Sequence, residues 1–585
     1  MPLGGCLLIP LIGWLNERVM KWYTVAAGFV TAGLTVSLIV SAGGAEIARV
    51  WWIPGIDAAI GIQLTGIGLY VAAVAGCIGA LAILYSVKYM EEYEDRYRPA
   101  RYYFLTLLFI GSMIALALTD SFLVLYIFWE LIGICSFGLI AYEYHRSKAR
   151  TAGAKAFIVT RFGDIGLLIG VVTLWSAMNA LGAEHPFSIS GTIDAALAGL
   201  IPMHMLAIAG AGFIAGAAGK SAQFPLHVWL PDAMEAPTTI SALIHAATLV
   251  NAGVYLAART LPMFALLPWW LPTLVWIGAI SALLAAVLAL LEKDLKRVLA
   301  FSTISQLGFM MAAVGAASIF ASQFHLMNHA IFKALLFLAA GSVIHAAHTR
   351  NMFEMGGLKR SLPITHITFA IGAAALAGVP LFNGFWSKDA IFEALLQAGH
   401  VGPLVLLIIT AILTAIYSVR MYWLTFQGDR RSAGEAHESS WQMTVPLGAL
   451  AVGTLISWIY VGGYTDKLGQ DLPHHQIPEV ELGYLWHHTF TSPLLLVGIA
   501  VVAILAVLGV QWSRHGPPVP EAPRLWADLV TDTKGFGDWF WGFWVVLMRA
   551  VASVLSLFQT GDLNYNSLWL AIGFIAVLLM LLGWG

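Results

Sequence analysis

Three protonatable side chains share one face of a strongly apolar segment, HLMNHAIFKALLFLAAG, residues 325–341. His325, His329 and Lys333 follow one another at intervals of four residues. On an α-helix they lie within about 80° of one another and extend over about 12 Å along the axis. Histidine exchanges protons near neutral pH, and a desolvated lysine releases its proton more readily than one in water. The spacing therefore predicts a section of a proton-transfer path.

A metal site is the alternative explanation for paired histidines. His325 and His329 have the H-x-x-x-H spacing of zinc metalloproteases, but Leu326 stands where those enzymes carry Glu. Further pairs, in a stretch expected to be a solvated outer loop, are His474–His475 and His487–His488. Loop histidines in such numbers are mostly solvated, and we expect no metal in this chain.

Other ionisable residues also lie within or beside apolar stretches, where a charge costs at least about 2.5–3.5 kcal/mol and is a functional candidate for that reason. They are Glu130, Arg161, Asp164, Lys220, His245, Lys296, Arg297, Lys388 and Asp389. Each alone has a structural explanation, such as an ion pair or, for Lys296 and Arg297, an interfacial anchor. Together they alternate through consecutive apolar segments, as a water-linked proton relay requires. Glu130 and Lys220 are expected to form an ion pair that tunes the proton affinity of the lysine.

Composition indicates the elements that must hold these groups. Of the 585 residues, 59% are hydrophobic and 11% charged, whereas soluble domains are about 25% charged. A membrane span takes about 20 apolar residues, and we count about 16 such segments. They cover 2–16, 22–43, 60–86, 102–119, 121–142, 155–178, 201–230, 238–260, 265–291, 296–315, 323–347, 363–395, 402–427, 442–463, 492–513 and 565–584. The expected fold is an all-α polytopic membrane protein.

Basic residues orient the predicted spans. They gather in alternate loops, from Arg18 and Lys21 after the first span to Arg430 and Arg431 after the thirteenth. Lys and Arg favour cytoplasmic loops, so both termini are expected on the outer face. The segment 514–563 mixes Trp and Phe with charged residues, which favours a lateral amphipathic helix on the cytoplasmic side. One more span at 540–558 is the alternative.

Two spans carry interruptions. GAAGKSAQFPLHVWLPDAMEAPT contains Lys220, and AGVPLFNGFWSKDAIFEA contains Lys388. Gly and Pro break the helical hydrogen-bond ladder, and matching breaks in two halves of a membrane protein indicate a transport site. The two are the seventh and the twelfth spans, offset by five, and this odd offset predicts two inverted five-helix repeats. The expected regions are N-terminal helices 1–101, repeats 102–260 and 265–427, C-terminal helices 428–513, the lateral helix 514–563 and an anchor helix 564–585.

Several classes of site are excluded by what the sequence lacks. The three cysteines lie in apolar runs without a C-x-x-C, so iron–sulfur ligation and a disulfide framework are not expected. Lys and Arg form no long basic patch, so nucleic acid is not an expected partner. No dinucleotide-binding glycine motif follows a strand, because we expect no strands.

Four stretches strongly resemble the antiporter-like subunits of respiratory complex I, and among them the subunit L family, whose mitochondrial counterpart is subunit 5. They are GKSAQFPLHVWLPDAMEAPTTISALIHAATLVNAGVYLAAR, DLKRVLAFSTISQLGFM, HLMNHAIFKALLFLAAGSVIH and GFWSKDAIF. The resemblance covers nearly the whole chain, and the residues 514–585 are similar to that family's lateral helix and its anchor. Departures are Thr65 in QLTG, where the family often has L-D-G, and short spans around the lateral segment.

The resemblance implies a role for each candidate. Glu130 and Lys220 would be the family's Glu–Lys pair, His245 its connecting histidine, and His325, His329 and Lys333 its central relay. Lys388 and Asp389 would lie near the exit, with Arg161, Asp164 and Lys296 in support. The implied protein is a proton-translocating subunit without its own redox cofactor, in a prokaryotic inner membrane. Flavin, iron–sulfur clusters and quinone would belong to partner subunits, with subunit M adjacent and the lateral helix along M and N.

Three other functions stay open at this stage. An Mrp-type sodium–proton antiporter shares the motifs, although its large subunit carries long extra C-terminal membrane regions. A ferredoxin-, deazaflavin- or hydrogenase-linked relative of complex I would carry the same chain, since other subunits select the electron donor. A carbon-concentrating transporter component or a scaffold is the last, and the two intramembrane lysines argue against a scaffold.

Overall fold

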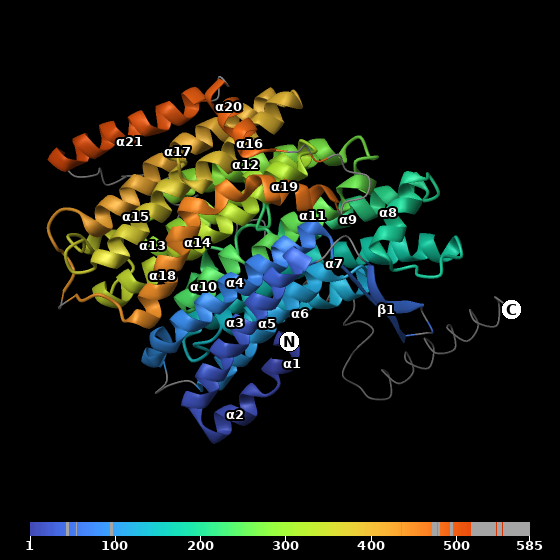
Figure 1. The fold of residues 1–585 in the computed structure, drawn as a ribbon, viewed down its shortest axis with the longest axis horizontal. Coiled ribbons are helices and arrows are strands. Elements are labelled where there is room, and N and C mark those ends of the chain that lie inside the picture. The colour runs from blue at the N-terminus through green and yellow to red at the C-terminus, as the bar shows by residue number, and fades with distance from the viewer. Residues whose placement is uncertain are drawn as a thin grey trace. The chain divides into compact units, whose positions relative to one another are not determined.

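The computed structural model (Figure 1) describes residues 1–41, 46–53, 57–93, 98–433, 436–470, 480–491 and 495–515, with Gly55, Ile477, Val546 and Ser553 as single residues. The chain divides into two units, Met1–Val519 and Pro520–Gly585. All but the first two residues of the expected lateral helix 514–563, and the whole anchor 564–585, lie outside the continuous described ranges.

Helices make up most of the described part, and most of them run alongside one another (Figure 1). The first eleven are α1 (Pro2–Cys6), α2 (Ile9–Leu15), α3 (Glu17–Ser41), α4 (Gly66–Tyr89), α5 (Pro99–Leu118), α6 (Phe122–Ile140), α7 (Ser147–Ala180), α8 (Ile189–Leu197), α9 (Met203–Lys220), α10 (Thr238–Ala246) and α11 (Leu249–Phe264). The others are α12 (Trp270–Leu291), α13 (Leu295–Gly315), α14 (Ile319–Ala347), α15 (Pro363–Ala377), α16 (Asn383–Gln397), α17 (Val401–Phe426), α18 (Trp441–Ile456), α19 (Val461–Gln470), α20 (Leu482–Thr491) and α21 (Leu495–His515). Short 3-10 helices are η2 (Met90–Tyr93), η3 (Asp232–Glu235), η4 (Met352–Glu354) and η5 (Ser457–Tyr460).

Length and hydropathy identify the membrane-crossing helices. Within the described ranges, 11 helical segments are long and apolar enough to cross a membrane. Shorter apolar helices, Pro2–Leu15, Pro363–Ala377 and Leu496–Leu505, fall at the expected first, twelfth and fifteenth spans. The chain is therefore a multi-pass helical membrane protein, and the full count of about 16 spans stays a prediction.

A β-hairpin corrects the expectation that the chain has no strands. β1 (Glu46–Ile53) and β2 (Ala58–Gln63) pair antiparallel. The sequence EIARVWWI of β1 is rich in the β-branched and aromatic residues that favour strands. The expected third span at 60–86 is therefore shorter, because its first residues belong to β2 and α4 begins at Gly66. There Thr65 Oγ1 accepts a hydrogen bond from Gly68 N at 3.2 Å and caps the helix.

An ion pair between a partly exposed arginine and a buried aspartate fastens the hairpin to the helical body. Arg49 of β1 donates to Asp120 Oδ2 at 2.9 Å. Ser188 Oγ and the backbone N–H of Ser190 donate to the same carboxylate at 2.8 Å and 2.9 Å. The side chain of Asp120 is almost fully buried, so its charge is satisfied by these donors and holds the hairpin in place.

Both predicted interruptions are present. α9 ends at Lys220, and 17 residues without regular α-helix separate it from α10. α15 ends at Gly378, whose φ of 82° is in the left-handed region, and α16 starts at Asn383. A third interruption, which the sequence did not predict, separates α10 from α11 just after His245. There Leu243 O, which still accepts from Ala247 N at 3.1 Å, also accepts from Thr248 Oγ1 at 2.8 Å.

Two helix pairs touch backbone to backbone along glycine seams. Between α7 and α9, a Cβ added to Gly212 would lie 2.1 Å from the carbonyl oxygen of Gly166. Between α12 and α13, a Cβ added to Gly278 would lie 2.4 Å from the carbonyl oxygen of Gly308. Small residues allow such close approach between membrane helices. The first seam brings α7, with Asp164, against α9, with Lys220.

Candidate functional site

An ion pair lies at the break after α9. Lys220 Nζ is 3.2 Å from Asp164 Oδ2, and both side chains are 0% exposed. Trp129 Nε1 donates to the other carboxylate oxygen, Asp164 Oδ1, at 2.6 Å. Two charges buried at this depth are stabilised only by each other and by such hydrogen bonds. Lys220 therefore has Asp164 as its counter-ion.

The expected direct pair between Glu130 and Lys220 was wrong. Glu130 forms an ion pair with Arg161 and accepts a hydrogen bond from Tyr126 Oη at 2.7 Å. Its side chain and that of Arg161 are partly exposed, unlike the Lys220–Asp164 pair. The glycine seam explains why Asp164, and not Glu130, is the partner of Lys220. It brings the part of α7 that carries Asp164 into contact with the end of α9.

Gly133 gives Lys220 the space for its position. A Cβ added to Gly133 would lie 2.9 Å from Lys220 Nζ. We expect Gly133→Ala to displace the ammonium group from Asp164, to destabilise the protein because the buried pair is weakened, and to lower proton pumping several-fold. Gly138→Ala on the same helix is the matched control, because its Cβ would meet only a methyl group of Leu105, at 2.9 Å. Pumping rates of the two variants in proteoliposomes check this; equal rates would contradict it.

The centre of the series holds two histidines without hydrogen-bond partners. Both ring nitrogens of His245 and of His329 are buried and unpartnered in the described part of the chain. His245 packs on Phe337 of α14, with ring centroids 4.6 Å apart. Lys333 donates to Ser302 Oγ and, at 3.3 Å, to Leu299 O. A buried imidazole that lacks a partner costs free energy, so both rings keep unused hydrogen-bonding capacity in the middle of the series.

His325 has partners on both sides. Its Nδ1 lies 2.9 Å from Ser387 Oγ of α16, and its Nε2 lies 3.1 Å from Gln306 Oε1 of α13. The ring is fully buried and 6.2 Å from that of His329, centroid to centroid. The three residues on this face of α14 therefore run from Lys333 through His329 to His325, and His325 contacts α16, the helix that carries Lys388.

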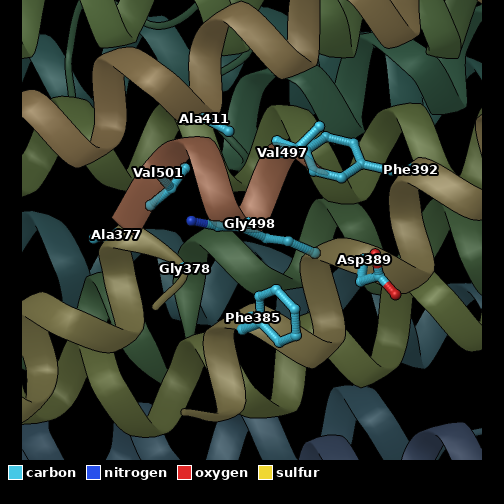
Figure 2. Close-up of a pocket in the computed structure, with 10 residues that line it drawn as sticks. Ala377, Gly378, Phe385, Asp389, Phe392, Ala411, Val497, Gly498 and Val501 are labelled. Carbon is cyan, nitrogen blue, oxygen red and sulfur yellow. The ribbon is translucent and has the colours of Figure 1, made fainter. Parts of the chain in front are cut away.

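Lys388 lies beside a small cavity. Its Nζ donates to Leu376 O of α15, and no carboxylate of the described residues lies within ion-pair distance of it. Figure 2 shows Asp389 on the far side of this cavity from Val501, which belongs to α21. The space open to the centre of a water molecule is about 20 Å³, and about 10–15 Å³ holds one water. The cavity thus has room for about one water beside the lysine.

The supporting residues divide into buried and interfacial groups. Lys296 is almost fully buried and donates to Ala236 O at 2.6 Å, just before α10 and His245. The interpretation of Lys296 as an anchor in the interface was therefore wrong. Arg297 does reach the surface, where it pairs with Glu292 at 3.1 Å.

Metal ligands do not gather in the described part of the chain. No group of three or more His, Cys, Asp or Glu side chains lies close enough to hold an ion there. His474 and His475 lie outside the described residues, so the pair stays untested.

Sequence reasoning missed several neutral members of this arrangement. Trp129, Gln306, Ser302 and Ser387 all contact a titratable group directly. The other residues were recognised because burying a charge in a membrane is costly. These four carry no charge, so that criterion could not identify them. Ser387 alone could have been suspected, because it directly precedes Lys388 in the sequence.

A multi-pass helical protein with interrupted helices and a series of buried lysines, histidines and carboxylates is of the antiporter-like, ion-translocating class. The profile described as "NADH:quinone oxidoreductase/Mrp antiporter, TM" matches residues 119–414. That range contains every candidate residue. The chain belongs to this family, and within it to the subunit L, or 5, members of complex I.

Individual relatives agree with this assignment. The chain is 35% identical to "NADH-quinone oxidoreductase subunit L" of Escherichia coli over 95% of its own length and 91% of the relative's. It is 44% identical to "F(420)H(2) dehydrogenase subunit L" of Methanosarcina mazei, over 65% of its length and 60% of the relative's. The solved structure of an Mrp complex from Dietzia sp. is similar with a TM-score of 0.80 and 27% identity, covering 98% of this chain and 61% of the other.

Proposed function

We propose that this chain moves protons across the membrane as the subunit L of a complex I that transfers electrons from NADH to quinone. The observation that supports this most is the fully buried Lys220–Asp164 pair at the end of an interrupted helix. A proton carrier needs a charge whose proton affinity changes when its partner moves. Redox energy would reach the pair through neighbouring subunits.

The path that we propose runs along the helices in chain order. Protons pass between the Glu130–Arg161 and Lys220–Asp164 pairs and His245. Water links His245 to His329 and Lys333, whose neighbour His325 leads to α16. Lys388 and Asp389 stand at the exit, and Lys296 biases His245 from the side. The unpartnered nitrogens of His245 and His329 support this water-linked section.

The remaining architecture is proposed on the same resemblance. It comprises 16 spans in regions 1–101, 102–260, 265–427, 428–513, 514–563 and 564–585, with the second and third as inverted repeats. Subunit M would lie adjacent, with the segment 514–563 along subunits M and N. Both termini would face outward in a prokaryotic inner membrane. Flavin, iron–sulfur clusters and quinone would belong to partner subunits, as the resemblance implies.

A second candidate differs only in the electron donor. The identity of 44% to a subunit named for F(420)H(2) dehydrogenase favours a deazaflavin-linked complex. The same proton path would serve either complex, because the donor binds elsewhere.

The test is to purify the native complex through this chain, identify its partners by mass spectrometry and reconstitute it in proteoliposomes. We expect acidification of the vesicle lumen when the donor is added outside, abolished by a proton ionophore. NADH-oxidising partners would support the first candidate and deazaflavin-oxidising partners the second. A complex with Mrp partners alone, whose transport requires sodium, would contradict both.

A further inference from the structure

Ser387 has one hydrogen to donate and two places to donate it. Its Oγ lies 2.9 Å from His325 Nδ1 and 2.9 Å from the carbonyl oxygen of Asn383. Both acceptors are fully buried, as is Ser387 itself. A serine hydroxyl carries a single donor hydrogen. Its direction must therefore depend on which hydrogens the imidazole carries.

The protonated ring satisfies all the contacts at once. Gln306 Oε1 lies 3.1 Å from His325 Nε2, and as a carbonyl oxygen it only accepts. With both ring nitrogens protonated, Nε2–H donates to Gln306, Nδ1–H donates to Ser387, and the serine donates to Asn383 O. Charge-assisted hydrogen bonds of this kind are the stronger ones. The geometry therefore fits an imidazolium at His325.

A neutral ring forces one neighbour to turn. If the single hydrogen is on Nε2, Nδ1 must accept from Ser387, and Asn383 O loses its hydroxyl donor. If it is on Nδ1, the amide of Gln306 must turn to present its NH2 group to Nε2. Gln306 Nε2 has no partner in the described part of the chain, so it is free to take that place. Each protonation change at His325 therefore reorients a neutral side chain on α16 or α13.

The serine connects this change to the helix that carries Lys388. Asn383 is the first residue of α16, and its Nδ2 donates to Ser457 Oγ at 3.0 Å. Ser457 in turn donates to Asn328 Oδ1 of α14 at 2.7 Å. The first turn of α16 is thus held between α14 and the end of α18. A change at Ser387 acts on one of the bonds that fix this turn.

We propose that Ser387 is a positioning residue that couples the protonation of His325 to the first turn of α16, and through it to Lys388. This inference rests on the proposed function, because it assumes that His325 takes up protons during turnover. Ser387 and Gln306 then act together, one on each ring nitrogen of His325. Each supplies the acceptor that favours the protonated ring.

Few titratable or charged groups surround the His325 ring and could change its response to pH. Lys388 of α16 and Lys333 of α14 are the charged groups that act on it. His329 lies one turn away on α14, with His245 of α10 beyond it. From α13 the ring meets Gln306 and Phe309, which do not titrate. Asp389 follows Lys388 on α16.

The test compares Ser387→Ala with Ser387→Thr in the native complex, as the pH profile of proton pumping in proteoliposomes. Without the acceptor, the protonated ring is less favoured. The high-pH midpoint of the pumping profile should therefore move down by about one pH unit, tenfold in proton affinity. Threonine keeps the hydroxyl and should restore the midpoint. Ser305→Ala is the matched control, because Ser305 is equally buried on α13 and its hydroxyl has no partner in the described part.

A second variant keeps the proposal testable if Ser387→Ala does not assemble. Gln306→Met removes the other acceptor and should move the midpoint in the same direction. A wild-type complex that pumps while neither variant moves the midpoint would overturn this inference and leave the proposed function intact. A wild-type complex that does not pump would instead overturn the proposed function.

Discussion

Replacing Lys220 by alanine is expected to stop proton pumping and to destabilise the assembled complex as well. Asp164 would remain fully buried without its counter-ion, and removing one partner of a buried pair costs about 3–5 kcal/mol. Loss of a proton-transfer group slows that step by about 10²–10⁴-fold. Pumping in proteoliposomes and thermal unfolding of the detergent-solubilised complex measure the two effects.

The double variant Lys220→Ala/Asp164→Asn separates stability from function. It removes both charges, so the unfolding temperature should return towards that of the wild type while pumping stays absent. Lys155→Ala is the control, because Lys155 pairs with Asp232 at 2.6 Å with both side chains partly exposed, and such pairs are worth about 0–1 kcal/mol. Full pumping by Lys220→Ala would disprove the role of the pair.

Replacing Lys388 by methionine should stop proton pumping without destabilising the complex, unlike Lys220→Ala. The acceptor of Lys388 Nζ is the neutral carbonyl of Leu376, so its removal leaves no unpaired charge behind. Methionine fills the space of the lysine stem without a polar head. We therefore expect an intact complex that no longer pumps, measured by native gel electrophoresis and by pumping in proteoliposomes.

Lys359→Met is the control for that variant. Lys359 is exposed and donates to Gln427 Oε1 at 3.3 Å. It should assemble and pump like the wild type. If Lys388→Met retained the full number of protons per electron, the exit role of Lys388 would be wrong.

The sequence predicted correctly those features that depend on residue type within one segment, namely charges in apolar runs and breaks in helices. Gly378 and the nearby Pro380 placed the break between α15 and α16 correctly. The intramembrane lysines and histidines were found because a charge in an apolar run is costly. These signals are local, and a single segment is enough to see them.

Properties that depend on how helices rotate against each other were not predictable in the same way. Glu130 and Asp164 are both acids near the first break, and only the contact between α7 and α9 shows which of them reaches Lys220. The break after His245 was missed because it contains neither Pro nor Gly. There the side chain of Asn251 donates to Ala246 O at the end of α10, and Thr248 Oγ1 donates to Leu243 O. The hairpin was missed because β1 fell in the loop expected between the second and third spans, and the residues 60–63 of β2 were assigned to the third span.

The glycine seam between α7 and α9 has a mechanical consequence. Contacts between backbone atoms contain no rotatable side chains that could yield, so the two helices should translate as one rigid body. Asp164 and Lys220 ride on that body together, and a push from a neighbouring subunit would not pull them apart by sliding one helix along the other. The joint that yields should instead be the segment after Lys220, where no regular α-helix resists bending. Force from outside would then move the residues that follow Lys220 and leave the distance between the two charges unchanged.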